Sequence, residues 1–363
     1  MRLLRSAVYA NGFCRRARFM SSNCTRTVMS FGDGSHGALG LPTSLTGIGG
    51  DAYEPTVVPG LPSDISTVSA GHYHSLAVTS SGALWAWGRN NEAQLGRGLL
   101  APRDTWNEPK RVEGLDKVNV CGAFASGVIS SAIGDDGSLW VWGKSKRGQL
   151  GLGKGITEAT VPSRVEPLAG EKIVKASFGW GHALAQTKDG KLFAWGYSAD
   201  GRIGKKEWRR RKICQLIWEP CLVEDLHGVE AVDIACGLDH SLVLCRNGNL
   251  LSCGSNAYGQ LGRVNQDMGM YPVDANFHPA SVASGLGHSL AISQVSSSNV
   301  TGDSTSLVSW GWNQSCQLGR AGPENIPLMV NGLEGESLVS GFRRSCTFHG
   351  SHIKGRTMDM GLW

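Results

Sequence analysis

Hydrophobic and polar positions alternate along short segments of this chain, and each segment ends at a glycine-containing turn. In the clearest example, LWAWGRNNEAQLG at 84–96, Leu84 and Ala86 fall on one side of an extended strand, with Trp85 and Trp87 on the other. A period of two over four to eight residues, bounded by turn residues, predicts a β-strand. We therefore expect an all-β protein made of short strands.

The same segment recurs about every 55 residues. Related copies read LWVWGKSKRGQLG at 139–151, LFAWGYSADGRIG at 192–204, LLSCGSNAYGQLG at 250–262 and LVSWGWNQSCQLG at 307–319, with a looser VMSFGDGSHGALG at 28–40. Self-similarity at one period predicts a repeat architecture. The glycine shared by the copies is found at Gly32, Gly88, Gly143, Gly196, Gly254 and Gly311.

A second motif, V-x-A-G-x-x-H-S-L-A-V, recurs in varied form before the copies from 84–96 onward, and turns such as DDG and RNG join the two. Asp-Gly and Asn-Gly turns predict β-hairpins. One such sheet cannot bury both of its faces, whereas sheets stacked around an axis can, which favours a propeller of blades. The glycine and histidine pairs are Gly71/His74, Gly179/His182, Gly237/His240 and Gly285/His288, and we align Gly122/Ala125 and Gly341/Arg344 with them.

These motifs, in particular LWAWGRNNEAQLG and VSAGHYHSLAV, resemble the regulator-of-chromosome-condensation repeat family over residues 28–341. The resemblance implies a β-propeller of the seven-bladed type. Because only six landmark glycines occur, we expect the last blade to be truncated, with 342–363 a divergent or truncated tail. A divergent last blade closed by another chain is the alternative. Truncation would leave an unpaired strand edge, which favours aggregation.

Residues 1–27 contain six arginines and no acidic residue. This composition, together with hydroxyl residues and a short apolar face, predicts a mitochondrial transit peptide. A basic tail without a targeting role, or a chloroplast address, is the alternative. Removing these six charges from the net +5 leaves −1, so the folded part is close to neutral, and its basic pI does not indicate nucleic-acid binding.

A basic insertion at 205–212, KKEWRRRK, follows the third full copy of the repeat. Arginines beside tryptophans can contact phosphates and stack on unpaired bases, so this insertion is our candidate RNA or protein contact. The alternative is a solvated loop whose tryptophans pack on the blade. The candidate residues are Lys205, Lys206, Trp208, Arg209, Arg210, Arg211, Lys212 and Trp218.

The remaining polar residues do not indicate catalysis. The chain has ten cysteines and no CxxC pair, and we expect buried free thiols at positions such as Cys121, Cys236 and Cys253 rather than a zinc site or a disulfide framework. The recurrent histidines fit a structural role in each blade better than a metal site. No phosphate-binding loop, Ser/His/Asp arrangement or metalloprotease motif occurs. We predict no catalytic residue, no metal and no cofactor, and no run of apolar residues is long enough to span a membrane.

Two activities known in the family can be compared with these residues. The ultraviolet-B photoreceptor uses Gly-Trp-Arg-His motifs in adjacent blades, whereas only Trp180 matches here and Gly181 replaces the arginine. The exchange factor for the small GTPase Ran carries an acidic residue directly after the loop glycine, whereas Asp239 here lies one position later. The resemblance therefore supports neither photoreception nor exchange on Ran.

The resemblance to plant mitochondrial members implies a non-enzymatic adaptor in the mitochondrial matrix. Such an adaptor would support organelle RNA processing, in particular intron splicing of transcripts for respiratory complex I subunits, with splicing factors as protein partners and organellar RNA as a further partner. A guanine-nucleotide exchange factor for a small GTPase, or a protein-binding scaffold without an RNA role, is the alternative. Each alternative would allow a chloroplast, cytosolic or nuclear location.

Overall fold

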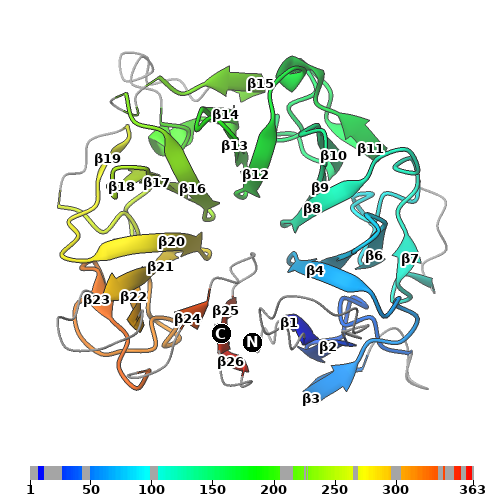
Figure 1. Ribbon diagram of the computed structural model, residues 1–363, viewed down its shortest axis with the longest axis horizontal. Helices are drawn as coiled ribbons and strands as arrows, with labels where there is room; N and C mark the ends of the chain where they lie inside the picture. Colours follow the sequence, from blue (N-terminus) through cyan, green and yellow to red (C-terminus); the bar gives the residue numbers. More distant parts are fainter. Residues whose placement is uncertain are drawn as a thin grey trace, which may run out of the picture. The chain divides into compact units, whose positions relative to one another are not determined.

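The computed structural model describes residues 7–11, 27–42, 50–98, 105–204, 216–224, 226, 228–264, 269–295, 304–333, 338–339, 347–352 and 357–361. Within them, five antiparallel sheets have four strands each, and we name each blade by its first strand (Figure 1). The β4 blade comprises β4 (Ile65–Ala70), β5 (His74–Thr79), β6 (Leu84–Gly88) and β7 (Lys110–Arg111). The β8 blade comprises β8 (Val120–Ala125), β9 (Ile129–Gly134), β10 (Leu139–Lys144) and β11 (Glu158–Arg164).

The other three blades repeat this order along the chain. The β12 blade contains β12 (Ile173–Phe178), β13 (His182–Thr187), β14 (Leu192–Tyr197) and β15 (Leu216–Leu222). The β16 blade contains β16 (Ala231–Cys236), β17 (His240–Cys245), β18 (Leu250–Gly254) and β19 (Tyr271–Pro272). The β20 blade contains β20 (His278–Ser284), β21 (His288–Val295), β22 (Ser304–Gly311) and β23 (Leu328–Met329).

The seven-bladed expectation is wrong, because the described residues form five four-stranded blades. Five copies of the landmark segment are preceded by a complete hairpin, and each supplies the third strand of one blade; the looser copy at 28–40 has no such hairpin before it. The other strands form two three-stranded sheets, β1 (Ala7–Asn11), β2 (Thr27–Gly32) and β3 (Ala52–Val57), and β24 (Leu338–Val339), β25 (Thr347–His352) and β26 (Thr357–Gly361). β1 falls within the predicted transit peptide, whose import stays a prediction.

The chain divides into two compact units. Unit 1 contains residues 1–144 and 158–164, and unit 2 contains residues 145–157 and 165–363. The loop at 145–157 belongs to unit 2 because its Gln149 side chain donates to the Gly179 carbonyl at 2.7 Å and its Gln149 carbonyl accepts from the Trp195 indole at 2.7 Å. β11, which follows this loop, pairs with β10 in unit 1.

A tryptophan hydrogen bond joins consecutive repeats inside each unit. The indole N–H of a fully buried tryptophan donates to the backbone carbonyl in the turn of the preceding repeat, at 2.7–3.0 Å. Because buried indoles carry a polar atom that must be paired, this bond fixes the orientation of a large core side chain. The donor and acceptor pairs are Trp87 and Ala38, Trp142 and Gln94, Trp195 and Gln149, and Trp310 and Gln260.

The glycine after each of these tryptophans has a positive φ, for example 103° at Gly88 and 101° at Gly196. A Cβ on Gly88 would lie 2.5 Å from the Tyr73 carbonyl oxygen, and one on Gly196 would lie 2.4 Å from the Gly181 carbonyl oxygen. Both the backbone conformation and the space therefore require glycine. The recurrence of this glycine in the sequence has a steric origin.

The β16 blade lacks the tryptophan, because Cys253 occupies its position. In the other repeats a turn glycine faces the indole, whereas Gly204 faces the Met270 side chain, with a Cβ there lying 2.8 Å from Met270 Cε. The fully buried Met270 joins Cys236, Cys245 and Cys253 in one hydrophobic cluster. An unbranched thioether can fill such a volume, so Met270 replaces the bulk that Cys253 omits.

Three inner strands of unit 2 are held together by one carboxylate. Asp233 on β16 forms an ion pair with Lys175 on β12, and it accepts hydrogen bonds from the Ser281 hydroxyl at 2.9 Å and the Val282 N–H at 3.0 Å on β20. The Asp233 side chain is only 13% exposed, so solvent screens these bonds weakly. One side chain therefore links three consecutive blades.

We predict that Asp233→Ala lowers the free energy of unfolding by about 3 kcal/mol, because it leaves the Lys175 ammonium and the Val282 N–H without their acceptor. Urea unfolding followed by circular dichroism measures this loss. The matched control is Asp116→Ala, which removes an exposed ion pair with Arg111 at 3.4 Å and is expected to cost less than about 1 kcal/mol. Equal losses in the two variants would contradict the linking role of Asp233.

Candidate interaction site

A second set of bonds between repeats starts at the recurrent histidines. The Nε2 atoms of His74, His182 and His240 lie 2.8–2.9 Å from serine hydroxyls of the following repeat, Ser130, Ser241 and Ser289. Each of these serines also donates to the turn carbonyl of the histidine's own repeat, at 2.7–2.8 Å. Since a hydroxyl has one proton, each histidine must be the donor to its serine, which assigns the proton to Nε2. The sequence predicted a structural histidine, and its partner is this serine.

The glycine three residues before each histidine makes room for the imidazole ring. A Cβ on Gly179 would lie 2.2 Å from the His182 Cε1 atom, and one on Gly237 would lie 2.1 Å from the His240 Cε1 atom. The second repeat has neither this glycine nor this histidine. Our alignment of Gly122 and Ala125 with these two positions is wrong. Strand register places Ser126 and Ile129 at the glycine and histidine positions.

Burial keeps His74 neutral. His74 is completely buried, and burial, followed by the nearby His72, lowers its pKa from 6.5 to about 3. A neutral ring can donate from Nε2 to Ser130 as described above. The described residues contain no group of three or more His, Cys, Asp or Glu side chains that could hold a metal ion.

Two groups of loop side chains in unit 2 pack over glycines, and we call them the first seat (Arg147 and Tyr197 over Gly181) and the second seat (Tyr258 and Trp312 over Gly287). In the first, the Arg147 guanidinium lies 5.3 Å from the centre of the Tyr197 ring, and a Cβ on Gly181 would lie 2.9 Å from Arg147 Cδ. In the second, the Tyr258 and Trp312 rings lie 5.6 Å apart at 31°, over Gly287. Glycine at the floor of each seat is what allows the large side chains to pack there.

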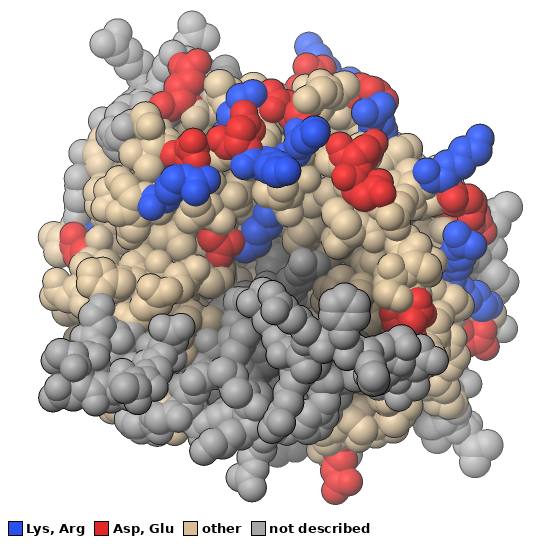
Figure 2. All heavy atoms as spheres, in the orientation of Figure 1, with Lys and Arg blue, Asp and Glu red and all other residues tan. Residues whose placement is uncertain are grey.

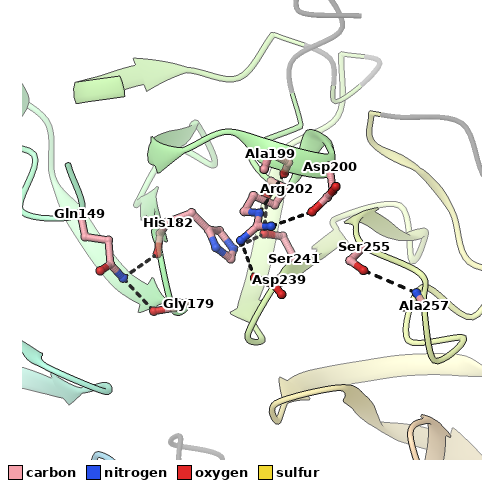
Figure 3. A network of polar contacts seen from close by, with 10 residues as sticks. All are labelled: Gln149, Gly179, His182, Ala199, Asp200, Arg202, Asp239, Ser241, Ser255 and Ala257. Carbon is pink, nitrogen blue, oxygen red and sulfur yellow. Dashed lines mark hydrogen bonds and ion pairs between the residues drawn. The ribbon is translucent and has the colours of Figure 1, made fainter. Parts of the chain in front are cut away.

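A charged cluster lies between the two seats along the repeat order. It consists of Arg202 and Asp200 from the copy at 192–204 and Asp239 from the loop before β17. Arg202, which replaces the glutamine of other repeats, is buried and pairs with Asp239 and with Asp200, the latter at 2.7 Å (Figure 3). Its guanidinium also lies 5.2 Å from the centre of the Tyr197 ring. The Arg202 carbonyl accepts from Ser241 Oγ at 2.7 Å, so the same residue serves the scaffold and the loop surface.

The sequence-predicted contact lies mostly outside the described residues. Lys205, Lys206, Trp208, Arg209, Arg210, Arg211 and Lys212 fall there, whereas Trp218 is half-buried on β15. The Trp218 carbonyl accepts from the Gly153 N–H at 3.2 Å, and this hydrogen bond joins β15 to the loop at 145–157. The contact role of these residues stays a prediction.

Charge on the visible face is mixed. Figure 2 shows Lys and Arg side chains beside Asp and Glu side chains, without a large area of one sign among the residues it colours. Such a face lacks the one-sided positive potential typical of nucleic-acid surfaces. Among the described residues, no helix has the length and apolar character needed to cross a membrane. The described cysteines form no disulfide, with Cys236 and Cys253 buried as predicted and Cys121 exposed, contrary to the prediction.

Sequence reasoning missed the two seats and the Arg202 cluster. Their signal was present, because Arg147, Asp200 and Tyr258 all occupy the fourth position after the landmark glycine, and Tyr197 and Trp312 the first. Comparing the residue at one repeat position in all copies would have identified these side chains. The repeat alignment alone could not have shown that Gly181 and Gly287 leave them room.

Comparison with known proteins shows which proteins this chain resembles. The model of the RCC1-like domain matches residues 27–353. The ultraviolet-B receptor UVR8 of Arabidopsis thaliana is 29% identical over 327 residues, covering 86% of this chain and 68% of the receptor. The mitochondrial RCC1 domain-containing protein RUG3 of Arabidopsis thaliana is 31% identical over 285 residues, covering 75% of this chain and 60% of RUG3.

The mouse secretion-regulating guanine nucleotide exchange factor is 30% identical over 293 residues, covering 74% of this chain and 61% of that protein. The chain thus spans about three fifths of the length of RUG3 and of the mouse protein. Among solved structures, Prp20p of Saccharomyces cerevisiae shares the fold with a TM-score of 0.68 at 21% identity, over 93% of this chain and 77% of Prp20p.

We predict that the stability of this protein falls as the pH drops from 6.5 toward 3, because the unfolded state binds a proton at His74 while the folded state does not. The stabilisation is complete above 6.5 and decreases by about 1.4 kcal/mol per pH unit below it. Thermal unfolding between pH 6.5 and 5 measures the slope. His74→Gln, which keeps a donor for Ser130, is expected to reduce this slope, and an unchanged slope would contradict the assignment.

We also predict that Arg202→Ala lowers the free energy of unfolding by about 2 kcal/mol, because it leaves the Asp239 carboxylate without its cation. Arg202→Gln restores the side chain of other repeats and is expected to lose less than half as much. Urea unfolding measures both variants. Arg246→Ala, which removes an exposed ion pair with Glu230, is the control and should change stability by under about 0.5 kcal/mol.

Proposed function

Because this chain belongs to the family of RCC1-like domain proteins, we propose that it is a non-enzymatic propeller adaptor in the mitochondrial matrix. It supports organelle RNA processing, in particular intron splicing of transcripts for respiratory complex I subunits, by holding splicing factors together. Two surfaces serve this role: the basic insertion at 205–212 and the loops around the histidines. The observation that carries the proposal is the pairing of an arginine-rich, acid-free segment at 1–27 with a mitochondrial relative.

Two features support the mitochondrial part of this proposal. Six arginines without an acidic residue at 1–27 are typical of an import sequence. RUG3, whose name describes it as mitochondrial, is 31% identical to this chain over 285 residues. The two features are independent, since one comes from the N-terminal segment and the other from the repeats.

The RNA part of the proposal depends on the insertion at 205–212. Six cations and one carboxylate there contrast with the mixed charge of the described face (Figure 2). Trp208 lies within the insertion, and Trp218 follows it on β15. Cations that neutralise phosphates and indoles that stack on bases are the elements of single-stranded RNA binding, and we expect an affinity that falls with salt.

Nucleotide exchange is the second candidate, and one contact argues against it. Asp239, the acidic residue closest to the position expected for exchange on Ran, is ion-paired with buried Arg202. Arg202 already neutralises this carboxylate, so a partner would have to compete with Arg202 for it. Release of labelled GDP from candidate small GTPases by the purified protein tests this alternative directly.

The test of the proposed function is the ratio of spliced to unspliced reads over every organellar intron in cells that lack this protein. We expect unspliced reads to rise for one or a few introns and to return to normal when the 363-residue chain is expressed again. Normal splicing of all introns would contradict the RNA-processing role.

We predict that replacing Arg209, Arg210 and Arg211 by alanine weakens RNA or splicing-factor recovery by about tenfold without changing the unfolding temperature, because three charges are lost from a segment that falls between β14 and β15 in the sequence. Crosslinked RNA and co-purified protein recovered from mitochondria measure the loss. The control variant replaces three exposed lysines from separate turns, Lys117, Lys154 and Lys188, and should retain full recovery. Full recovery with the arginine variant would exclude the insertion as the contact.

A further inference from the structure

The first seat presents a cation and an exposed indole together. Trp180, next to the floor glycine Gly181, is 47% exposed. The Arg147 guanidinium stacks on the Tyr197 ring, 5.3 Å from its centre, and Lys146 beside it is exposed. Arg147 is half-buried, and it forms no ion pair with a carboxylate among the described residues.

The second seat is apolar. Tyr258 is 49% exposed and packs on the half-buried Trp312 over Gly287, with a Cβ on that glycine lying 3.1 Å from the Tyr258 ring. Tryptophan, tyrosine and arginine are the residues that contribute most to protein–protein binding energy. Their concentration on loops from consecutive repeats of unit 2 is the composition of a protein-binding surface.

We propose that these loops bind an extended protein segment that presents a carboxylate to Arg147 and a large apolar side chain to Tyr258 and Trp312. A planar guanidinium held by ring stacking pairs with a carboxylate in two parallel hydrogen bonds and loses little side-chain freedom on binding. The segment's apolar side chain covers aromatic surface that is now in water.

The charges of the cluster between the seats favour a protein over RNA. Asp200 and Asp239 border Arg202, and the Asp200 side chain is 53% exposed. A phosphate backbone carries one negative charge per nucleotide and would meet these carboxylates, whereas a peptide can place a neutral or basic residue there. This proposal does not require the basic insertion, and it would hold for these loops whether or not the protein acts in splicing.

The experiment measures fluorescence anisotropy of a labelled twelve-residue peptide, with one glutamate and one phenylalanine among neutral residues, binding to the purified full chain. Three further probes are the same peptide with glutamine for glutamate, the same peptide with alanine for phenylalanine, and a twelve-nucleotide oligouridylate. We expect the glutamate–phenylalanine peptide to bind at least about tenfold more tightly than either altered peptide. Equal binding of the glutamine peptide, or no binding of the first probe, would overturn the proposal.

Variants locate the site. Arg147→Ala and Tyr258→Ala are each expected to weaken the first peptide by about tenfold, and Arg147→Lys by less, because lysine keeps the charge but not the planar fork. The control is Arg246→Ala, which changes an exposed arginine on the turn between β17 and β18. We expect this variant to bind the peptide as tightly as the unchanged protein does. Unchanged binding by Arg147→Ala would overturn the assignment.

The alanine variant of Arg209, Arg210 and Arg211 separates this proposal from the proposed function. It should bind the peptide normally even where it loses RNA. Two results would assign the surface to RNA and overturn the proposal. One is a loss of peptide binding in that variant equal to the loss in Arg147→Ala. The other is tighter binding of the oligouridylate than of the peptide at the first seat.

Discussion

The structure depends on a hydrogen bond from a buried tryptophan to the turn carbonyl of the repeat before it. The four indoles that make this bond are fully buried, at Trp87, Trp142, Trp195 and Trp310. A buried indole N–H without an acceptor is costly, so each tryptophan needs a neighbouring turn in the right place. At Gln94 and Gln260, the serine that accepts from histidine donates to the same carbonyl as the indole, so one peptide oxygen organises each of these two junctions.

That constraint also explains the candidate interaction surface. The indole N–H and the serine hydroxyl donate to the turn carbonyls and fix the turn backbone. The exposed side chains of these turns therefore start from a fixed backbone. Side chains at these positions vary freely between repeats, as Arg147, Asp200 and Tyr258 show. The scaffold therefore specifies where the loop side chains lie, and the sequence of each repeat decides what they bind.

Much of the fold could be predicted from the sequence, because the repeat is local. The glycine after the tryptophan, the hairpin turns and the alternation each follow from backbone geometry within one copy. The number of blades was predicted wrongly, because it was taken from the resemblance rather than from a count of the complete hairpins. The positions of Ser126 and Ile129 were missed, because the alignment chose the glycine at Gly122. Strand register excludes that choice, since Gly122 pairs with Ile133. The Met270 replacement for tryptophan depends on contacts between distant segments, which a repeat motif does not contain.

Hydrogen exchange of the tryptophan indole N–H groups, measured by nuclear magnetic resonance, tests the central claim most directly. If the indole-to-turn bond holds consecutive repeats together, the indoles of Trp87, Trp142, Trp195 and Trp310 will exchange only with global unfolding, whereas the indole of Trp180, which is 47% exposed, will exchange far faster. Exchange of the four buried indoles at the rate of Trp180 would contradict the account.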